Sequence, residues 1–105
     1  MSKVNMIAGQ YTAYAFESVT VSTTSIGLTA GNFDNNTESV KRIIITIESA
    51  QIRWRYDGGA PTASVGHLNN PFDTIILVGR TNISNFRAIR AGSTDATIRV
   101  TFERS

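Results

Sequence analysis

Apolar and polar residues alternate with a period of two along most of the chain, and no window keeps apolar residues at helical spacing for three turns. Such alternation is typical of strands with one face in a core and the other in solvent. Turn-forming Gly, Pro, Asn and Asp residues separate the alternating segments. The pattern predicts about eight short strands and no helix, with the strands in segments 14–22, 25–31, 40–50, 51–56, 63–68, 73–79, 83–92 and 96–104.

The clearest strand patterns lie in the middle and at the end of the chain. Segment 40–50 aligns three isoleucines on one face, and Ile44 interrupts the opposite polar face. This pattern predicts a central strand that is covered on both sides. Segment 96–104 alternates just as regularly, with Ile98 and Phe102 among its inward residues.

Other segments break the alternation. In the first strand, Tyr14 and Phe16 share one parity, whereas Val19 and Val21 share the other. The change indicates a β-bulge, in which one extra residue shifts the following side chains to the other face of the sheet. Segment 83–92 also loses its regular alternation, so we expect a bulge or an edge position there.

Eight short strands separated by turns favour an all-β fold, and 105 residues suit one domain spanning residues 1–105. We expect a β-sandwich of antiparallel strands with a jelly-roll-like arrangement, and a partly closed β-barrel is the alternative. Residues 1–10 precede the first strand and are a candidate extended arm.

The composition is that of a globular protein with few charges. Hydrophobic residues make up 41% of the chain and charged residues 17%, against an average of about 25% charged residues. A surface poor in charge favours a subunit that neighbouring molecules cover. The chain begins without a secretory signal and has no apolar run that could cross a membrane, so we expect synthesis in the cytoplasm and no membrane contact.

The formal net charge is +2, and eight of the ten basic residues are arginine. The arginines are interleaved with acidic residues and do not gather on one element, which argues against a nucleic-acid partner. Arginine side chains pair well with the carboxylates of a neighbouring subunit. We therefore take four arginines as interface candidates: Arg53, Arg55, Arg87 and Arg90.

Candidate chemistry is sparse. His67 is the only histidine, and the chain has no cysteine and no G-x-S-x-G nucleophile motif. A lone imidazole lacks the partners that nucleophilic catalysis requires, and one histidine without cysteine excludes the usual zinc sites. We therefore expect no catalytic residue, no metal and no cofactor, and we interpret the protein as a non-enzyme.

The segment "QIRWRYDGGAPTASVGH", residues 51–67, predicts a structural corner after a strand. An aspartate can bond back to the turn, a glycine pair permits positive φ, and a proline fixes the direction in which the chain leaves. Its residues are Trp54, Asp57, Gly58, Gly59, Pro61 and His67.

The strand that enters the corner has two distinct faces. Trp54 and Tyr56 share a parity with Ile52, which predicts a core position for the indole. Arg53 and Arg55 lie on the opposite, outward face. The alternative is that Trp54 and Tyr56 form a stacking platform for sugar rings, as in carbohydrate-binding modules.

Two stretches, "IRWRYDGGAPTASVGH" at 52–67 and "NFRAIR" to "ATIRVTF" at 85–102, resemble a family of small proteins encoded in tailed-phage genomes. The family pattern is I-R-[WY]-R-[YF]-D-G-x-x-P-T-x-x-x-G-H, followed by N-F-R-A-I-R and A-T-[IL]-R-V-T-[YF]. The resemblance covers roughly the C-terminal half of the chain. It implies a virion structural protein of the head or tail modules.

The function expected from this resemblance is that of a capsid decoration (cement) subunit, which stabilises the head through protein–protein contacts in the virion. The expected partners are the major capsid protein or other virion proteins and copies of this chain, with a trimer as one arrangement. A tail or baseplate component is an alternative within the same class. A carbohydrate-binding β-sandwich module is the alternative from another class.

Overall fold

The computed structural model describes residues 11–33 and 40–104, so the candidate arm at 1–10 lies outside the described residues. The described elements, in chain order, are β1 (Thr12–Val21), the 3-10 helix η1 (Ala30–Asn32), β2 (Arg42–Glu48), β3 (Ile52–Arg55), β4 (His67–Asn69), β5 (Thr74–Val78), the helix α2 (Arg80–Asn85), β6 (Arg87–Arg90) and β7 (Ala96–Arg104).

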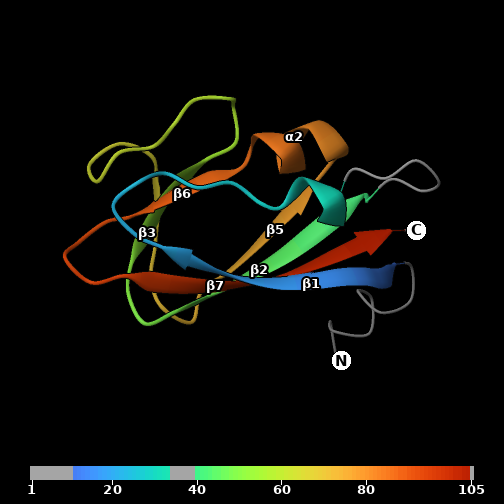
Figure 1. The fold of residues 1–105 in the computed structure, drawn as a ribbon, viewed down its shortest axis with the longest axis horizontal. Coiled ribbons are helices and arrows are strands. Elements are labelled where there is room, and N and C mark those ends of the chain that lie inside the picture. The colour runs from blue at the N-terminus through green and yellow to red at the C-terminus, as the bar shows by residue number, and fades with distance from the viewer. Residues whose placement is uncertain (1–10, 34–39, 105) are drawn as a thin grey trace.

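The seven described strands form two antiparallel sheets that pack together. One sheet has the order β1-β7-β2-β5 and the other the order β4-β3-β6; the strands of the larger sheet lie side by side in Figure 1. The predicted antiparallel β-sandwich is therefore confirmed. The alternative, a partly closed barrel, is wrong, because the described strands form two separate sheets packed together and no closed barrel.

The segment predicted as the second strand is reduced to an isolated bridge. Ile26 and Ala88 of β6 exchange two backbone hydrogen bonds of 2.8 and 2.9 Å. A Cβ added at the neighbouring Gly27 would lie 3.2 Å from the carbonyl oxygen of Phe86. The segment thus runs close to the β6 backbone, and glycine at its centre weakens a regular ladder.

The helix α2 contradicts the expectation of a chain without helices. It follows Gly79, whose φ of 102° is open to glycine at little cost, and it buries Ile83 completely. With six residues it is too short to show the three-turn periodicity that identifies a helix in sequence. Segment 83–92 is therefore the end of a helix followed by β6, which lies at a sheet edge as expected.

The core lies between the sheets. Fully buried side chains from β2 and β7 meet there in register, with Ile43 opposite Phe102 and Ile47 opposite Ile98. β2 is central in its sheet, as predicted. Coverage on both sides is wrong, because Ile44 on the outer face is only half-buried.

The bulge predicted in β1 is present, but at a different place. The register against β7 shifts between Ala13 and Ala15, and from Ala15 to Val21 the pairing is regular. Val19 therefore points into the core, while Tyr14 and Phe16 are exposed. The aromatic residues did not belong to the buried face that the sequence suggested.

Candidate functional site

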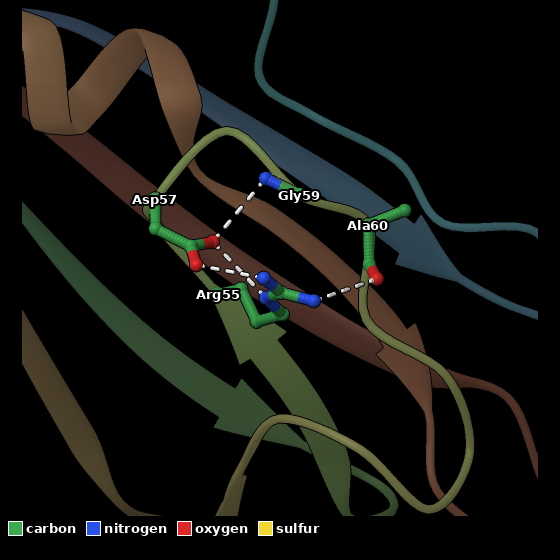
Figure 2. Close-up of polar contacts among 4 residues, drawn as sticks. All are labelled: Arg55, Asp57, Gly59 and Ala60. Carbon is green, nitrogen blue, oxygen red and sulfur yellow. Dashed lines mark hydrogen bonds and ion pairs between the residues drawn. The ribbon is translucent and has the colours of Figure 1, made fainter.

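The corner after β3 is built around an ion pair, which Figure 2 shows. Arg55 donates from Nε to Oδ1 of Asp57 at 3.0 Å and from Nη2 to Oδ2 at 2.7 Å. The backbone N–H of Gly59 also donates to Oδ1, at 3.2 Å, and Arg55 Nη1 reaches the carbonyl oxygen of Ala60 at 3.5 Å. These hydrogen bonds, first from Arg55 and then from Gly59, lower the pKa of Asp57 to about 2.

The two glycines of the corner serve different purposes. Gly58 has a φ of 93°, as the turn chemistry predicts. Gly59 does not have a positive φ, so that part of the prediction is wrong. A Cβ at Gly59 would lie 2.5 Å from Arg55 Nη2, so this residue leaves space for the guanidinium.

The chain after the glycines folds back against β3. Pro61 is buried, and a Cβ at Gly66 would lie 3.1 Å from the carbonyl oxygen of Trp54 and 3.2 Å from Pro61 Cβ. Arg53 donates to the carbonyl oxygens of Ala63 at 3.3 Å and of Gly66 at 3.0 Å. The loop is therefore held to the strand by a side chain that the sequence assigned to an interface.

Aromatic rings in and next to β3 and β4 form a cluster beside this loop: Trp54 lies in β3 and His67 in β4, whereas Tyr56 follows β3 and Phe86 precedes β6. The Trp54 ring lies 5.5 Å from Tyr56, 5.0 Å from His67 and 5.8 Å from Phe86, measured between centroids. Trp54 is half-buried against the core, and its Nε1 donates to Asn69 Oδ1 at 2.7 Å. Tyr56 and His67 are exposed. The indole thus supports two exposed rings and is itself neither a fully buried core residue nor an open platform.

An open cavity of about 470 Å³ lies next to this cluster. Both exposed rings and the ion pair contribute to its walls, which are formed by Arg55, Tyr56, Asp57, Val65, Gly66 and His67. Sequence reasoning found the corner but not the cavity, because the loop closes one wall only when the chain turns back at Gly66.

The remaining interface candidates also make contacts within the chain. Arg87 donates to Ser25 through its side chain, at 3.3 Å to both the hydroxyl and the carbonyl oxygen. Arg90 donates to Asp95 Oδ1 at 2.6 Å. Donation from Ser22 and from Arg90 lowers the pKa of Asp95. All four interface candidates thus hold loops of this chain, and contact with another subunit stays a prediction for them.

A second candidate surface lies on the outer face of the larger sheet, and sequence reasoning missed it. The register places Phe16 of β1 beside Thr101, Thr101 beside Ile44, and Ile44 beside Ile76 of the edge strand β5. Phe16 is 60% exposed, Ile76 48% and Val78 55%. We call the four apolar residues Phe16, Ile44, Ile76 and Val78 the outer patch.

The outer patch has charges on both sides that are already paired. The ion pair of Arg99 with Glu48 measures 3.2 Å and lies toward one end of the strands, and that of Arg42 with Glu103 measures 2.6 Å and lies toward the other. Thr101 separates Phe16 from Ile44, and Arg42 of the second ion pair lies directly opposite Val78. The face therefore presents several exposed apolar side chains to solvent, with one threonine and a paired charge among them.

Phe72 lies near the start of β5 and is the most exposed large apolar residue described. Its side chain is 89% exposed and its φ is 75°, a left-handed conformation that a bulky residue rarely adopts. Its N–H donates to the carbonyl oxygen of Ile47 at 2.7 Å, which ties the turn before β5 to β2. An exposed phenylalanine in a strained conformation is a candidate contact residue.

The sequence does contain a signal for the exposed positions of the outer patch. If Val19 and Val21 define the buried parity of β1, Phe16 must face outward. The run Ile75 to Val78 reads as fully apolar, yet alternate residues of β5 are exposed because they lie on the outer face of the sheet, away from the core.

Within the described parts of the chain, no group of three or more Asp, Glu or His side chains gathers where it could hold a metal ion. No helix among the described residues is long and apolar enough to cross a membrane. No protein-family model matches the chain, and neither does any curated protein or solved structure.

Proposed function

We propose that the protein is a non-enzymatic structural subunit of a tailed-phage virion, of the capsid decoration class, and that it attaches to neighbouring subunits through the outer patch. The observation that carries the proposal is the row from Phe16 to Ile76 on the outer face, in which β1, β2 and β5 contribute apolar side chains and β7 contributes Thr101. The assignment to a virion rests on the resemblance of segments 52–67 and 85–102 to tailed-phage proteins.

The physical case for the outer patch is its composition. Cores of protein interfaces are rich in aromatic residues and poor in charged residues. The patch contains Phe16, its flanking charges are paired, and Phe72 stands near the start of the same edge strand. At roughly 5 Å per strand, the row spans about 15 Å. A neighbouring subunit that covered it would remove this apolar surface from water, which favours association.

We further propose that the sandwich is a jelly roll with one reduced strand. If the Ile26 bridge counts as the second of eight strands, the larger sheet contains the first, eighth, third and sixth strands. The other sheet then contains the second, seventh, fourth and fifth. This is the order in which a jelly roll arranges its two Greek keys, and viral capsid and lectin domains both use the architecture.

The proposed partners are the major capsid protein, other virion proteins or copies of this chain, and a trimer is one such assembly. Electron microscopy of purified particles of the phage that carries this gene should show the protein in symmetric positions, as attachment through many equivalent contacts requires. Absence of the protein from the particle would end the proposal.

A matched pair of variants tests the surface. Ile76→Asp introduces a charge into the outer patch, and Leu68→Asp does the same on edge strand β4 of the other sheet, where the leucine is 45% exposed against 48% for Ile76. We expect Ile76→Asp to abolish attachment to particles stripped of the protein, and Leu68→Asp to attach like the natural chain. Equal attachment of both variants would show that the patch is not the contact surface.

A further inference from the structure

The cavity beside the corner is a second site, unrelated to the outer patch. Its volume of about 470 Å³ falls within the range of roughly 300–1,000 Å³ that small-molecule sites occupy. Its lining combines the rings of Tyr56 and His67 with the ion pair of Arg55 and Asp57, and Val65 and Gly66 complete it.

The rings are held in place before any ligand binds. The centroids of Tyr56 and His67 are 6.4 Å apart with planes tilted by 35°, and Trp54 stands within 5.5 Å of both. Trp54 is fixed in turn by its hydrogen bond to Asn69 and by contact with the buried Phe86. Because the support is fixed, a ligand that stacks on these rings orders few further side chains.

The polar wall carries both charges, and they cancel. Asp57 is ionised at neutral pH, as it would be at its ordinary pKa of 3.8, and the hydrogen bonds from Arg55 and Gly59 lower this pKa further, to about 2. Arg55 faces it in a two-point contact. With its charge neutralised by the pair, the wall offers little attraction to an anion or a cation. A carboxylate has about four lone-pair sites, so Asp57 keeps capacity for a hydroxyl donor.

We propose that this cavity binds a neutral saccharide, with a sugar ring stacked on Tyr56 and His67 and one of its hydroxyls donating to Asp57. The apolar C–H face of a sugar suits an aromatic wall, and its hydroxyls suit a charged but neutralised pair of side chains. Because the cavity is open, it accepts one ring of a longer chain. Trp54 is the support of the platform and does not contact the sugar.

The test begins with the full-length protein on an array of neutral and acidic oligosaccharides, followed by calorimetry with the neutral oligosaccharide that binds best. Tyr56→Ala removes the stacking ring, and Tyr14→Ala is the matched control, because these tyrosines are 39% and 38% exposed and Tyr14 lies in β1, outside the lining of the cavity. We expect Tyr56→Ala to weaken binding roughly tenfold or more, in line with other aromatic stacking contacts. Tyr14→Ala should bind like the natural chain.

Three results would overturn the proposal: no neutral oligosaccharide binding below a Kd of about 10 mM, binding of acidic oligosaccharides alone, or binding that survives Tyr56→Ala. Melting temperatures of both tyrosine variants separate loss of the ring from loss of the fold. Asp57→Asn, which keeps the shape of the side chain, should weaken binding by a further measurable factor because hydroxyls bond a carboxylate more strongly than an amide.

Discussion

The outer faces of the two sheets differ in whether their side chains make contacts within the chain. The outer face of the three-stranded sheet carries Arg53 and Arg55, and both guanidinium groups turn back to hold the loop that follows β3. The outer face of the four-stranded sheet carries Phe16 and Ile76, and nothing among the described residues covers these exposed side chains. The two arginines of the smaller sheet are satisfied by their own chain, although Leu68 opposite Arg53 is exposed as well, whereas the larger sheet leaves several apolar side chains in water.

The difference shows that charge alone is a poor guide to a docking surface. An exposed arginine reads in sequence as available to a partner, but its donors are used wherever a local carbonyl or carboxylate lies within reach. An apolar side chain on the outer face of a strand has no comparable partner nearby and stays in contact with water. The surface that most favours a neighbour is therefore the one whose residues the sequence assigned to the core.

The largest expected effect on stability comes from comparing a buried phenylalanine with an exposed one. Phe86 is 1% exposed beneath the corner, and Phe86→Ala should lower the free energy of unfolding by about 3–5 kcal/mol through lost contacts and a residual cavity. Phe16→Ala on the outer patch should change it by less than about 0.5 kcal/mol. Urea denaturation of both variants checks this, and a large cost for Phe16→Ala would show that the patch belongs to the core.

The strands themselves were predictable because alternation reports burial directly. β2 and β7 have one buried face each and are long enough for the period to be unambiguous. α2 was not predictable, because six residues with one buried isoleucine give no period. The bulge in β1 was recognised but misplaced, because sequence shows that the parity changes without showing which aromatic residues are on the solvent side.

Two ion pairs on the outer face of the larger sheet give the next effect. Arg42 and Glu103 have side chains 11% and 9% exposed, whereas those of Arg99 and Glu48 are both 44% exposed. Glu103→Ala leaves a guanidinium in a buried position and should cost about 3 kcal/mol. Glu48→Ala removes a solvent-screened contact and should cost at most about 1 kcal/mol. Thermal unfolding compares the two, and equal losses would contradict the difference in burial.

The corner was predictable in kind and not in detail. Turn chemistry placed Asp57 and Gly58 correctly, because these rules depend on neighbouring residues alone. The requirement for glycine at position 59 depends on where the loop places the Arg55 guanidinium. The carbonyl partners of Arg53 likewise depend on how the loop folds back through Gly66. These contacts join residues that are many positions apart in the sequence, so they depend on the path of the backbone. Alternation and turn rules do not describe that path.

Phe72 gives an effect of opposite sign, because replacing it should stabilise the isolated molecule. An L-residue in the left-handed region is strained by roughly 1–2 kcal/mol, and a side chain that is 89% exposed returns little packing. Phe72→Gly should therefore raise the free energy of unfolding by up to about 1 kcal/mol, after the loss of glycine's freedom in the unfolded chain. If the ring contacts a partner, the same variant should attach less well to particles. A variant that is less stable would show that Phe72 packs within the chain.

The smallest expected effect is a pH dependence of stability, and it comes from the Arg55–Asp57 pair on the smaller sheet. The folded pKa of Asp57, about 2, lies below its ordinary value of 3.8, so the unfolded chain binds more protons between these values. The stabilisation from the Arg55–Asp57 pair is therefore present above about pH 4 and is lost as the pH falls toward 2. A carboxyl titration by NMR should give a midpoint near 2 for the natural chain and a midpoint closer to 3.8 for Arg55→Ala. Arg53→Ala is the control: this arginine bonds Ala63 and Gly66 instead of Asp57, so its removal should leave the midpoint low. A midpoint that stays low without Arg55 would mean that the face is held by the backbone of the loop and not by its arginines.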